Sequence, residues 1–309
     1  MISKLFFAAS AVLLQLTDTV ALPHRRNNGL KFTSIVAFGD SWTDTGRAFE
    51  MSNHTLPAHP SYFQGRFSNG PLWIEHVVAN TSLPIINMAI GGASTSNDLV
   101  PSFATGPGGI NIAIPGIDDQ VAEFLNSTQD FDSEKPLIVL YGGLNDVNFN
   151  FDISPTQVFL SLMKSKERLE AAYPQAEFLF LDYPDLSLIP FDFYLGGLNQ
   201  SQLATFSRGL TRLFEDMVVN NTLNEKANTH FVSFLDLFGQ WDYSRQPRLY
   251  GFDPLGAYGS CLVGVYHESD EITLCDDPDS MVYFDKYHAS GRAHFWMGRK
   301  VLQWLGVGA

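Results

Sequence analysis

The sequence alternates short apolar runs with longer segments of helical spacing, and this order constrains the fold more than any other feature. The apolar runs are rich in β-branched and aromatic residues and lie at 34–38, 85–90, 137–141, 177–181 and 231–235. The segments with helical spacing lie at 72–79, 117–125, 155–173, 202–223 and 289–305. Continuous apolar runs are typical of strands buried on both faces of a parallel sheet. The pattern therefore predicts a three-layer α/β/α fold around a five-stranded parallel sheet.

The first 21 residues read as a secretory signal peptide. Lys4 precedes an apolar stretch at 5–14, and Thr19-Val20-Ala21 supplies the small residues of a cleavage site. The apolar stretch is shorter than the roughly 20 residues that a membrane-spanning helix needs. We therefore expect a secreted, extracellular protein without a membrane anchor. Residues 22–31 form an N-terminal segment in which Arg25-Arg26 is either a processing site or a chance pair, and the main domain is expected at 32–309.

Two further patterns fit an oxidising, secretory route. The chain contains just two cysteines, Cys261 and Cys275, for which a disulfide is expected and two free thiols are the alternative. The sequence also has five Asn-x-Ser/Thr sites, each a candidate for N-glycosylation. Their asparagines are Asn53, Asn80, Asn126, Asn199 and Asn220.

Composition narrows the classes of partner. The chain of 309 residues is 45% hydrophobic and 17% charged, which is enough to bury a substantial core. Its net charge of -14 repels the phosphate backbone of nucleic acids, so we expect no nucleic-acid partner. A monomer that binds a small-molecule or oligosaccharide ester is expected instead.

Polar clusters follow the first three predicted strands and precede the last predicted helix. Ser41 follows the first strand, Gly92 the second and Asn145 the third, while Asp285 and His288 stand shortly before the final helix. In open parallel sheets, ligands bind beyond the carboxyl ends of the strands. We therefore expect these five residues to converge on one site.

This set of residues supplies the groups that acyl transfer requires. A serine becomes a strong nucleophile when a histidine takes its proton and a carboxylate orients that histidine, as Ser41, His288 and Asp285 could. The oxyanion of the tetrahedral intermediate needs hydrogen-bond donors, for which we expect the Ser41 N–H, the Gly92 N–H and the Asn145 side-chain amide. No zinc-ligand motif accompanies them, and neither a metal nor a cofactor is expected.

The order of these motifs resembles the SGNH hydrolase superfamily. The matching blocks are Gly39-Asp40-Ser41, a glycine after the second strand, Gly143-Leu144-Asn145-Asp146 and Asp285-x-x-His288. Three further stretches are similar to fungal GDSL acetylesterases of carbohydrate esterase family 16, and they are Asn69–Trp73, Asn87–Ala93 and Asp119–Val121. The resemblance implies a serine esterase that removes acetyl groups from sugars or hemicellulose oligosaccharides. The alternatives are a GDSL lipase or phospholipase that acts on longer acyl esters, and a carbohydrate-binding glycoprotein without activity.

The sequence departs from the family pattern at two positions and leaves one assignment open. Trp42 stands where the name-giving motif has leucine, and Ala289 stands where many relatives have proline. The first departure concerns the shape of the loop and the second how the final helix starts, and neither concerns the chemistry. Gly91 and Gly92 can each be matched to the oxyanion glycine, and the distance from Asn87 favours Gly92.

Two other features carry expectations about structure. Asp40 and Asp146 flank the predicted catalytic serine and asparagine, and loop-shaping hydrogen bonds to nearby backbone are their expected role, with a part in acid–base chemistry as the alternative. The segment 241–283 has no clear periodicity, contains both cysteines and leads to Asp285. Long irregular segments in compact domains tend to be functional or disordered. A disulfide here would restrain the loop that positions Asp285 and His288.

Overall fold

The computed structural model describes residues 30–105, 111–127, 131–193, 197–223, 228–266 and 271–308. The expected signal peptide at 1–21 and the Arg25-Arg26 pair lie outside the described residues.

A five-stranded parallel sheet forms the centre of the fold, in the order β2-β1-β5-β6-β7. Its strands are β1 (Ser34–Gly39), β2 (Ile85–Asn87), β5 (Pro136–Tyr141), β6 (Glu177–Leu181) and β7 (Thr229–Val232). Every residue of β1 and β5 is buried, as expected for strands covered on both faces. The predicted fold class is therefore confirmed.

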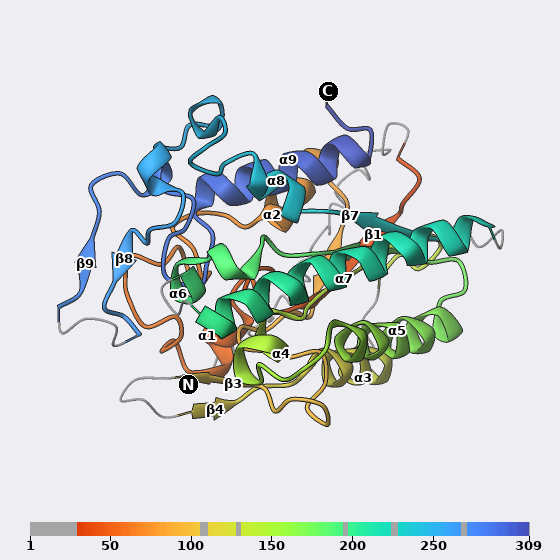
Figure 1. The fold of residues 1–309 in the computed structure, drawn as a ribbon. Helices are drawn as coiled ribbons and strands as arrows, with labels where there is room; N and C mark the ends of the chain where they lie inside the picture. Colours follow the sequence, from red (N-terminus) through yellow and green to blue (C-terminus); the bar gives the residue numbers. More distant parts are fainter. Residues whose placement is uncertain are drawn as a thin grey trace, which may run out of the picture.

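Helices cover both faces of this sheet (Figure 1). On one face α2 (Trp73–Thr81) packs against α9 (Gly291–Trp304). On the other face α5 (Pro155–Ala172) packs between α3 (Ile117–Asn126) and α7 (Gly197–Leu223). Short helices complete the described part of the chain, namely α1 (Arg47–Met51), α4 (Leu144–Phe149), α6 (Pro190–Phe193) and α8 (Leu235–Gly239).

Local sequence signals determine where two of the long helices begin. Ser154 caps α5 by accepting a hydrogen bond from the Gln157 N–H at 3.2 Å, and Pro155 occupies the first helical position. Ser290 caps α9 in the same way, accepting from the Ala293 N–H at 3.2 Å. The second cap matters for the site, because α9 begins three residues after His288. Within the described residues, no helix is both long enough and apolar enough to cross a membrane.

Two small antiparallel hairpins stand outside the central sheet. The first pairs β3 (Phe103–Thr105) with β4 (Asn111–Ala113), and the second pairs β8 (Leu262–Val263) with β9 (Thr273–Leu274). Cys261 and Cys275, one residue outside the second hairpin at each end, form a disulfide with an S–S distance of 2.18 Å. The predicted pairing of the cysteines is therefore present in the structure.

Two strands differ from their predicted bounds by more than one residue. β2 ends at Asn87 rather than at residue 90, and β7 spans Thr229–Val232 rather than 231–235. The predicted strand extends to Phe234 and Leu235 because these apolar residues follow its apolar run. In the structure, Leu235 begins α8, and the polar residues that start β7 lie at the edge of the sheet, where a strand need not be apolar throughout.

Candidate active site

Ser41 lies in a tight turn immediately beyond the carboxyl end of β1. Gly39, the last residue of the strand, leaves no room for a side chain, since an added Cβ would lie 2.6 Å from the Tyr141 carbonyl oxygen. The Gln120 side chain holds Gly39 at both backbone groups, accepting from its N–H at 3.1 Å and donating to its carbonyl at 2.9 Å. Asp40 then accepts a hydrogen bond from the Trp42 N–H at 3.0 Å. These contacts fix the backbone that presents Ser41.

The structure brings Ser41, His288 and Asp285 into one chain of hydrogen bonds. His288 Nε2 lies 2.8 Å from Ser41 Oγ, and His288 Nδ1 lies 2.8 Å from each carboxylate oxygen of Asp285. Asp285 is fully buried, while Ser41 and His288 keep 4% and 6% of their surface exposed. The Ser41 hydroxyl and the His288 imidazole are therefore accessible only over a small area, and the Asp285 carboxylate is shielded from water.

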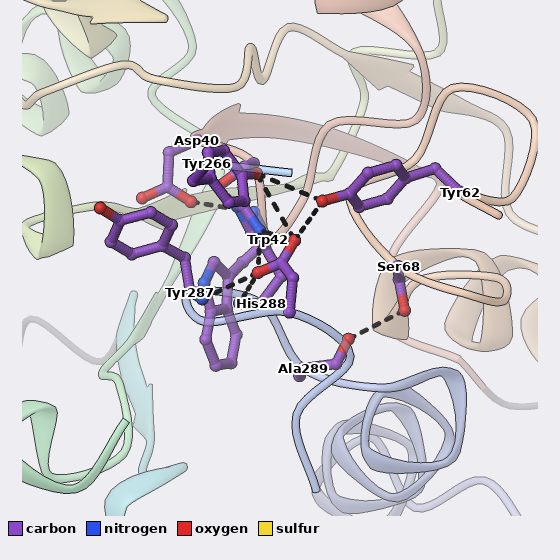
Figure 2. A network of polar contacts seen from close by, with 10 residues as sticks. Asp40, Trp42, Tyr62, Ser68, Tyr266, Tyr287, His288 and Ala289 are labelled. Atoms are coloured by element: carbon purple, nitrogen blue, oxygen red, sulfur yellow. Dashed lines mark hydrogen bonds and ion pairs between the residues drawn. The ribbon is translucent and has the colours of Figure 1, made fainter. Parts of the chain in front are cut away.

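A local turn holds Asp285 and His288 relative to each other. Asp285 Oδ1 accepts hydrogen bonds from the backbone N–H groups of Tyr287 and His288, each at 2.8 Å. Asp285 Oδ2 also accepts a hydrogen bond from the hydroxyl of Tyr62 at 2.6 Å (Figure 2). The spacing of three residues thus lets one carboxylate organise its own turn and bind the imidazole.

The two glycines after β2 have different hydrogen-bonding roles. The Gly91 N–H donates to Asp44 Oδ2 at 2.7 Å and is therefore already engaged. In the part of the chain that the structure describes, no acceptor is assigned to the Gly92 N–H. Gly92 has a φ of +91°, and an added Cβ would lie 2.4 Å from the Phe103 carbonyl oxygen. Of the two N–H groups, that of Gly92 is therefore the one left available for a ligand, and its role as oxyanion donor stays a prediction.

Asn145 lies in the first turn of α4, next to the loop that carries Gly92. Its side-chain amide donates to the Ala93 carbonyl at 2.8 Å and lies 3.5 Å from Asp40 Oδ2, which is the outer limit for a hydrogen bond. The residue is 7% exposed. Asn145 therefore links the loop that carries Gly92 and Ala93 to the turn that carries Asp40 and Ser41. Its second amide N–H, which makes the weaker contact, is the one that could donate to an oxyanion.

The Asn145→Ala variant should lose roughly 10²- to 10³-fold in kcat, the usual loss for one oxyanion donor. KM should change little, because the oxyanion exists only in the transition state and intermediate. Steady-state kinetics on an activated ester will measure both constants, with Asn148→Ala on the same helix as the matched control. Retention of most of the kcat by Asn145→Ala would contradict the assignment.

Asp40 and Asp146 act within the loops, in agreement with the expected structural role. Asp146 accepts from the N–H of Thr95 at 2.9 Å and from its hydroxyl at 2.5 Å. Asp40 accepts from the Tyr183 hydroxyl at 2.6 Å in addition to the Trp42 N–H. Burial raises the pKa of each carboxyl to about 6, and these hydrogen bonds oppose the increase. Trp42 itself is buried and packs its ring on Tyr183.

Sequence reasoning missed several residues that support the site. They form long-range hydrogen bonds to the turn around Ser41, to the loop that carries Gly91 or to Asp285, and they are Asp44, Tyr62, Gln120 and Tyr183. For Gln120 the sequence does offer a signal, because the stretch Asp119-Gln120-Val121 is similar to fungal GDSL acetylesterases. The two tyrosines have no local motif that distinguishes them from the other aromatic residues of the chain.

The disulfide-bonded hairpin is joined to the strand-like segment that leads to Asp285. The Leu262 N–H donates to the Phe284 carbonyl at 2.6 Å, and the Cys261 N–H donates to the Tyr283 carbonyl at 3.3 Å. Cys261 also packs with Phe284 in a small buried cluster. The position of the hairpin is therefore coupled to the backbone on which Asp285 stands.

Reduction of the Cys261–Cys275 disulfide should lower activity before the central sheet unfolds. The reason is that the cross-link restrains the hairpin beside Asp285, whereas the sheet and its covering helices do not depend on it. Activity and far-ultraviolet circular dichroism, followed over a titration with reductant, will show two midpoints. The Cys261→Ser/Cys275→Ser double variant, which has no disulfide to reduce, is the control. Equal midpoints for the two signals would refute this coupling.

Comparison with known proteins places this site in a family. The model of the GDSL-like lipase/acylhydrolase family matches residues 35–301. The chain is 31% identical to the thermolabile hemolysin of Vibrio parahaemolyticus over 284 residues, which is 88% of this chain but 64%, less than two thirds, of that relative. It is 28% identical to the phosphatidylcholine-sterol acyltransferase of Aeromonas hydrophila, covering 76% of this chain and 67% of the relative.

Two further similarities are weaker. The acetylesterase of Hypocrea jecorina is 27% identical over 138 residues, covering 41% of this chain and 39% of the relative. The structure of an aryl esterase from M. smegmatis superimposes with a TM-score of 0.52 at 13% identity, covering 89% of this chain and 98% of that one. The latter shows a common fold. With the family model matching 35–301, the chain belongs to the GDSL-like lipase/acylhydrolase family.

Proposed function

We propose that this protein is an ester hydrolase that acts through an acyl-enzyme on Ser41, and that acyl esters of lipids are its substrates. The observation that carries the catalytic part is the chain of 2.8 Å contacts from Ser41 through His288 to Asp285. A buried carboxylate, an imidazole and a hydroxyl in this arrangement are suited to nucleophilic attack on a carbonyl carbon.

The proposed reaction has two halves. His288 Nε2 takes the proton of Ser41 as Oγ attacks the carbonyl carbon, and the oxyanion is held by the N–H groups of Ser41 and Gly92 and by the Asn145 amide. The intermediate then expels the alcohol oxygen, which receives the proton from His288. Water attacks the acyl-enzyme with His288 as base, and the carboxylic acid leaves.

The three stretches that resemble fungal acetylesterases do not determine which acyl group the site accepts. Asn69 Oδ1 accepts from the Gly291 N–H at 2.8 Å, and Asn87 Nδ2 donates to the Thr43 carbonyl at 2.7 Å. Gln120, from the third stretch, binds the backbone of Gly39. All three residues support backbone near the catalytic groups, so their presence is compatible with esters of different acyl length.

Our choice of substrate class is therefore supported by how much of this chain is similar to each known protein. The acyltransferase and the hemolysin resemble more of this chain than the fungal acetylesterase does, and the name of the first refers to a phospholipid. Lipid acyl esters are our first candidate for this reason. Acetylated sugars or hemicellulose oligosaccharides are the second, supported by the similarity to the Hypocrea jecorina acetylesterase.

Secretion is part of the proposal. The disulfide supports folding in an oxidising compartment. Asn53, Asn80, Asn126 and Asn220 are exposed, and Asn199 is half-buried, so four of the five candidate glycosylation sites are open to modification. A protein recovered from culture medium whose mass falls after endoglycosidase treatment would support this part, and retention inside the cell would contradict it.

The test is a series of p-nitrophenyl esters from acetate to palmitate, followed by phosphatidylcholine vesicles and acetylated xylo-oligosaccharides. Ser41→Ala is the control for hydrolysis without the nucleophile. Rates that rise with acyl length and release of fatty acid from vesicles support the first candidate. Hydrolysis restricted to acetyl esters, with acetate released from the oligosaccharides, supports the second. Failure to hydrolyse any ester contradicts both and leaves a carbohydrate-binding glycoprotein without activity.

A further inference from the structure

The segment 62–69 lies between α1 and α2 in the chain and runs along the turn that carries the proposed catalytic acid and base. Its residues contact this turn and the start of α9 at four points, of which Figure 2 shows those made by Tyr62 and Ser68. The contacts are Tyr62 hydroxyl to Asp285 Oδ2 at 2.6 Å, the Phe67 ring to the His288 ring at 5.0 Å between centroids, Ser68 Oγ to the Ala289 carbonyl at 2.9 Å, and Asn69 Oδ1 to the Gly291 N–H at 2.8 Å. The turn is thus held from outside as well as by its own hydrogen bonds.

Among these contacts, Tyr62 reaches the carboxylate itself. Asp285 Oδ1 is occupied by two backbone N–H groups, while Oδ2 faces His288 Nδ1 at 2.8 Å and the Tyr62 hydroxyl at 2.6 Å. The hydroxyl of Tyr266 lies farther from the same oxygen, at 3.5 Å. Burial, and next the nearby charge of Asp285, raise the pKa of Tyr62 well above its usual value. Tyr62 therefore keeps its proton and acts as the donor.

We propose that Tyr62 is a positioning residue for the proposed triad: by donating to Asp285 Oδ2 it orients the carboxylate and moderates how strongly Asp285 attracts the imidazolium form of His288. The inference rests on the proposed function, because it assigns His288 as the base. Tyr62 itself does not touch the reacting atoms. It acts through Asp285, 223 residues away in the chain.

The ring and the hydroxyl of Tyr62 have separable roles. The ring packs edge-on against Phe284 at 5.3 Å between centroids, within a buried cluster that contains Cys261 and Leu262. This packing would be kept by phenylalanine. The hydroxyl alone makes the hydrogen bond to Asp285, and Tyr62 is 7% exposed, so water replaces it poorly. The Tyr62→Phe variant therefore isolates the electrostatic contribution.

Other titratable groups lie around the Asp285–His288 pair and contribute to its pH dependence. They are Tyr266, Tyr287, Lys286, Asp40 and His294. Burial raises the pKa of Asp40 to about 6 and lowers that of His294 to about 3. The Tyr62 hydroxyl bonds to neither of these two groups, and its partners are Asp285 Oδ2 at 2.6 Å and the Tyr266 hydroxyl at 3.4 Å. A change in the pH profile caused by its removal therefore arises at Asp285 and at the Tyr266 hydroxyl beside it.

The experiment compares the pH profiles of kcat/KM for the wild type and Tyr62→Phe on a p-nitrophenyl ester. Without the hydroxyl, Asp285 should hold the imidazolium more strongly, so the acid limb should move to higher pH by roughly half a unit. The kcat at the optimum should fall by roughly tenfold, as expected for the loss of a hydrogen bond to a buried charge. Active-site titration with a fluorophosphonate will correct both values for the fraction of folded protein.

Two further variants separate this role from a purely structural one. Tyr258→Phe removes the hydrogen bond between Tyr258 and Asp242, which lies outside the triad, and should leave the acid limb in place. Site-specific 3-fluorotyrosine at position 62 is a stronger donor of nearly the same shape, and it should move the acid limb to lower pH. This second variant keeps the test decisive if Tyr62→Phe folds poorly.

The outcomes distinguish this inference from the proposed function. If the wild type hydrolyses esters and the acid limbs of the wild type and both position-62 variants coincide, Tyr62 is not a positioning residue. If the wild type hydrolyses no ester, the proposed function is wrong, and so is this inference, because it depends on that function. Opposite shifts of the acid limb in Tyr62→Phe and the 3-fluorotyrosine variant would establish the role.

Discussion

Replacing Ser41 by alanine should abolish ester hydrolysis, with kcat falling by roughly 10⁵- to 10⁶-fold. The hydroxyl lies 2.8 Å from His288 Nε2, and no acyl-enzyme can form without it. The turn that carries Ser41 is held by hydrogen bonds from the Gly39 N–H to Gln120 and from the Trp42 N–H to Asp40. Neither bond involves the Ser41 hydroxyl, so the variant should fold normally. Activity on p-nitrophenyl esters and circular dichroism will test the two parts of this prediction.

The exposed Ser244 provides a matched control for the Ser41 variant. Its hydroxyl bonds to Asp242 in a surface turn, so Ser244→Ala should keep full activity. Intact mass after incubation with a fluorophosphonate should show one adduct on the wild type and on Ser244→Ala, and none on Ser41→Ala. A Ser41→Ala protein that still hydrolyses esters or forms the adduct would show that another residue is the nucleophile.

The Asp285→Asn variant should lose roughly 10⁴-fold in kcat. In the wild type both carboxylate oxygens accept from His288 Nδ1, which leaves Nε2 free to take the proton of Ser41. An asparagine amide can present an N–H to Nδ1 instead, and this favours the tautomer with a proton on Nε2. That imidazole cannot act as the base, although the geometry is nearly unchanged.

Steady-state kinetics of Asp285→Asn at several pH values will measure this loss. Asp242→Asn is a suitable control, since Asp242 bonds to Ser244 and Tyr258 away from the triad. A decrease of less than tenfold in Asp285→Asn would mean that Asp285 does not orient His288, and the acid of the triad would have to be sought elsewhere.

The central strands could be predicted closely, because a strand buried on both faces must be apolar throughout. The runs at 137–141 and 177–181 coincide with β5 and β6 to within one residue. The predicted bounds of β7 lie too far along the chain because this strand lies at the edge of the sheet and begins with Thr229 and His230, which are not apolar. The boundary with α8 likewise depends on packing rather than on a local pattern.

The proposed catalytic residues could be found from the sequence because each stands in a short motif at a strand end or helix start. The supporting residues could not, since their roles depend on contacts between distant parts of the chain. Tyr62 and Tyr183 bond to carboxylates 223 and 143 residues away. The choice between Gly91 and Gly92 depended on Asp44, whose carboxylate occupies one of the two N–H groups.

The hydrogen bond between Ser41 and His288 joins residues separated by 247 positions in the chain. Closing a contact of such high sequence separation is entropically costly, and it is expected to form late in folding. Asp285 and His288 belong to one local turn, whereas Ser41 depends on β1 at the interior of the sheet. In a refolding experiment, the return of enzyme activity would therefore report the docking of the last helix and its preceding turn onto an already formed sheet, a step that circular dichroism alone does not resolve.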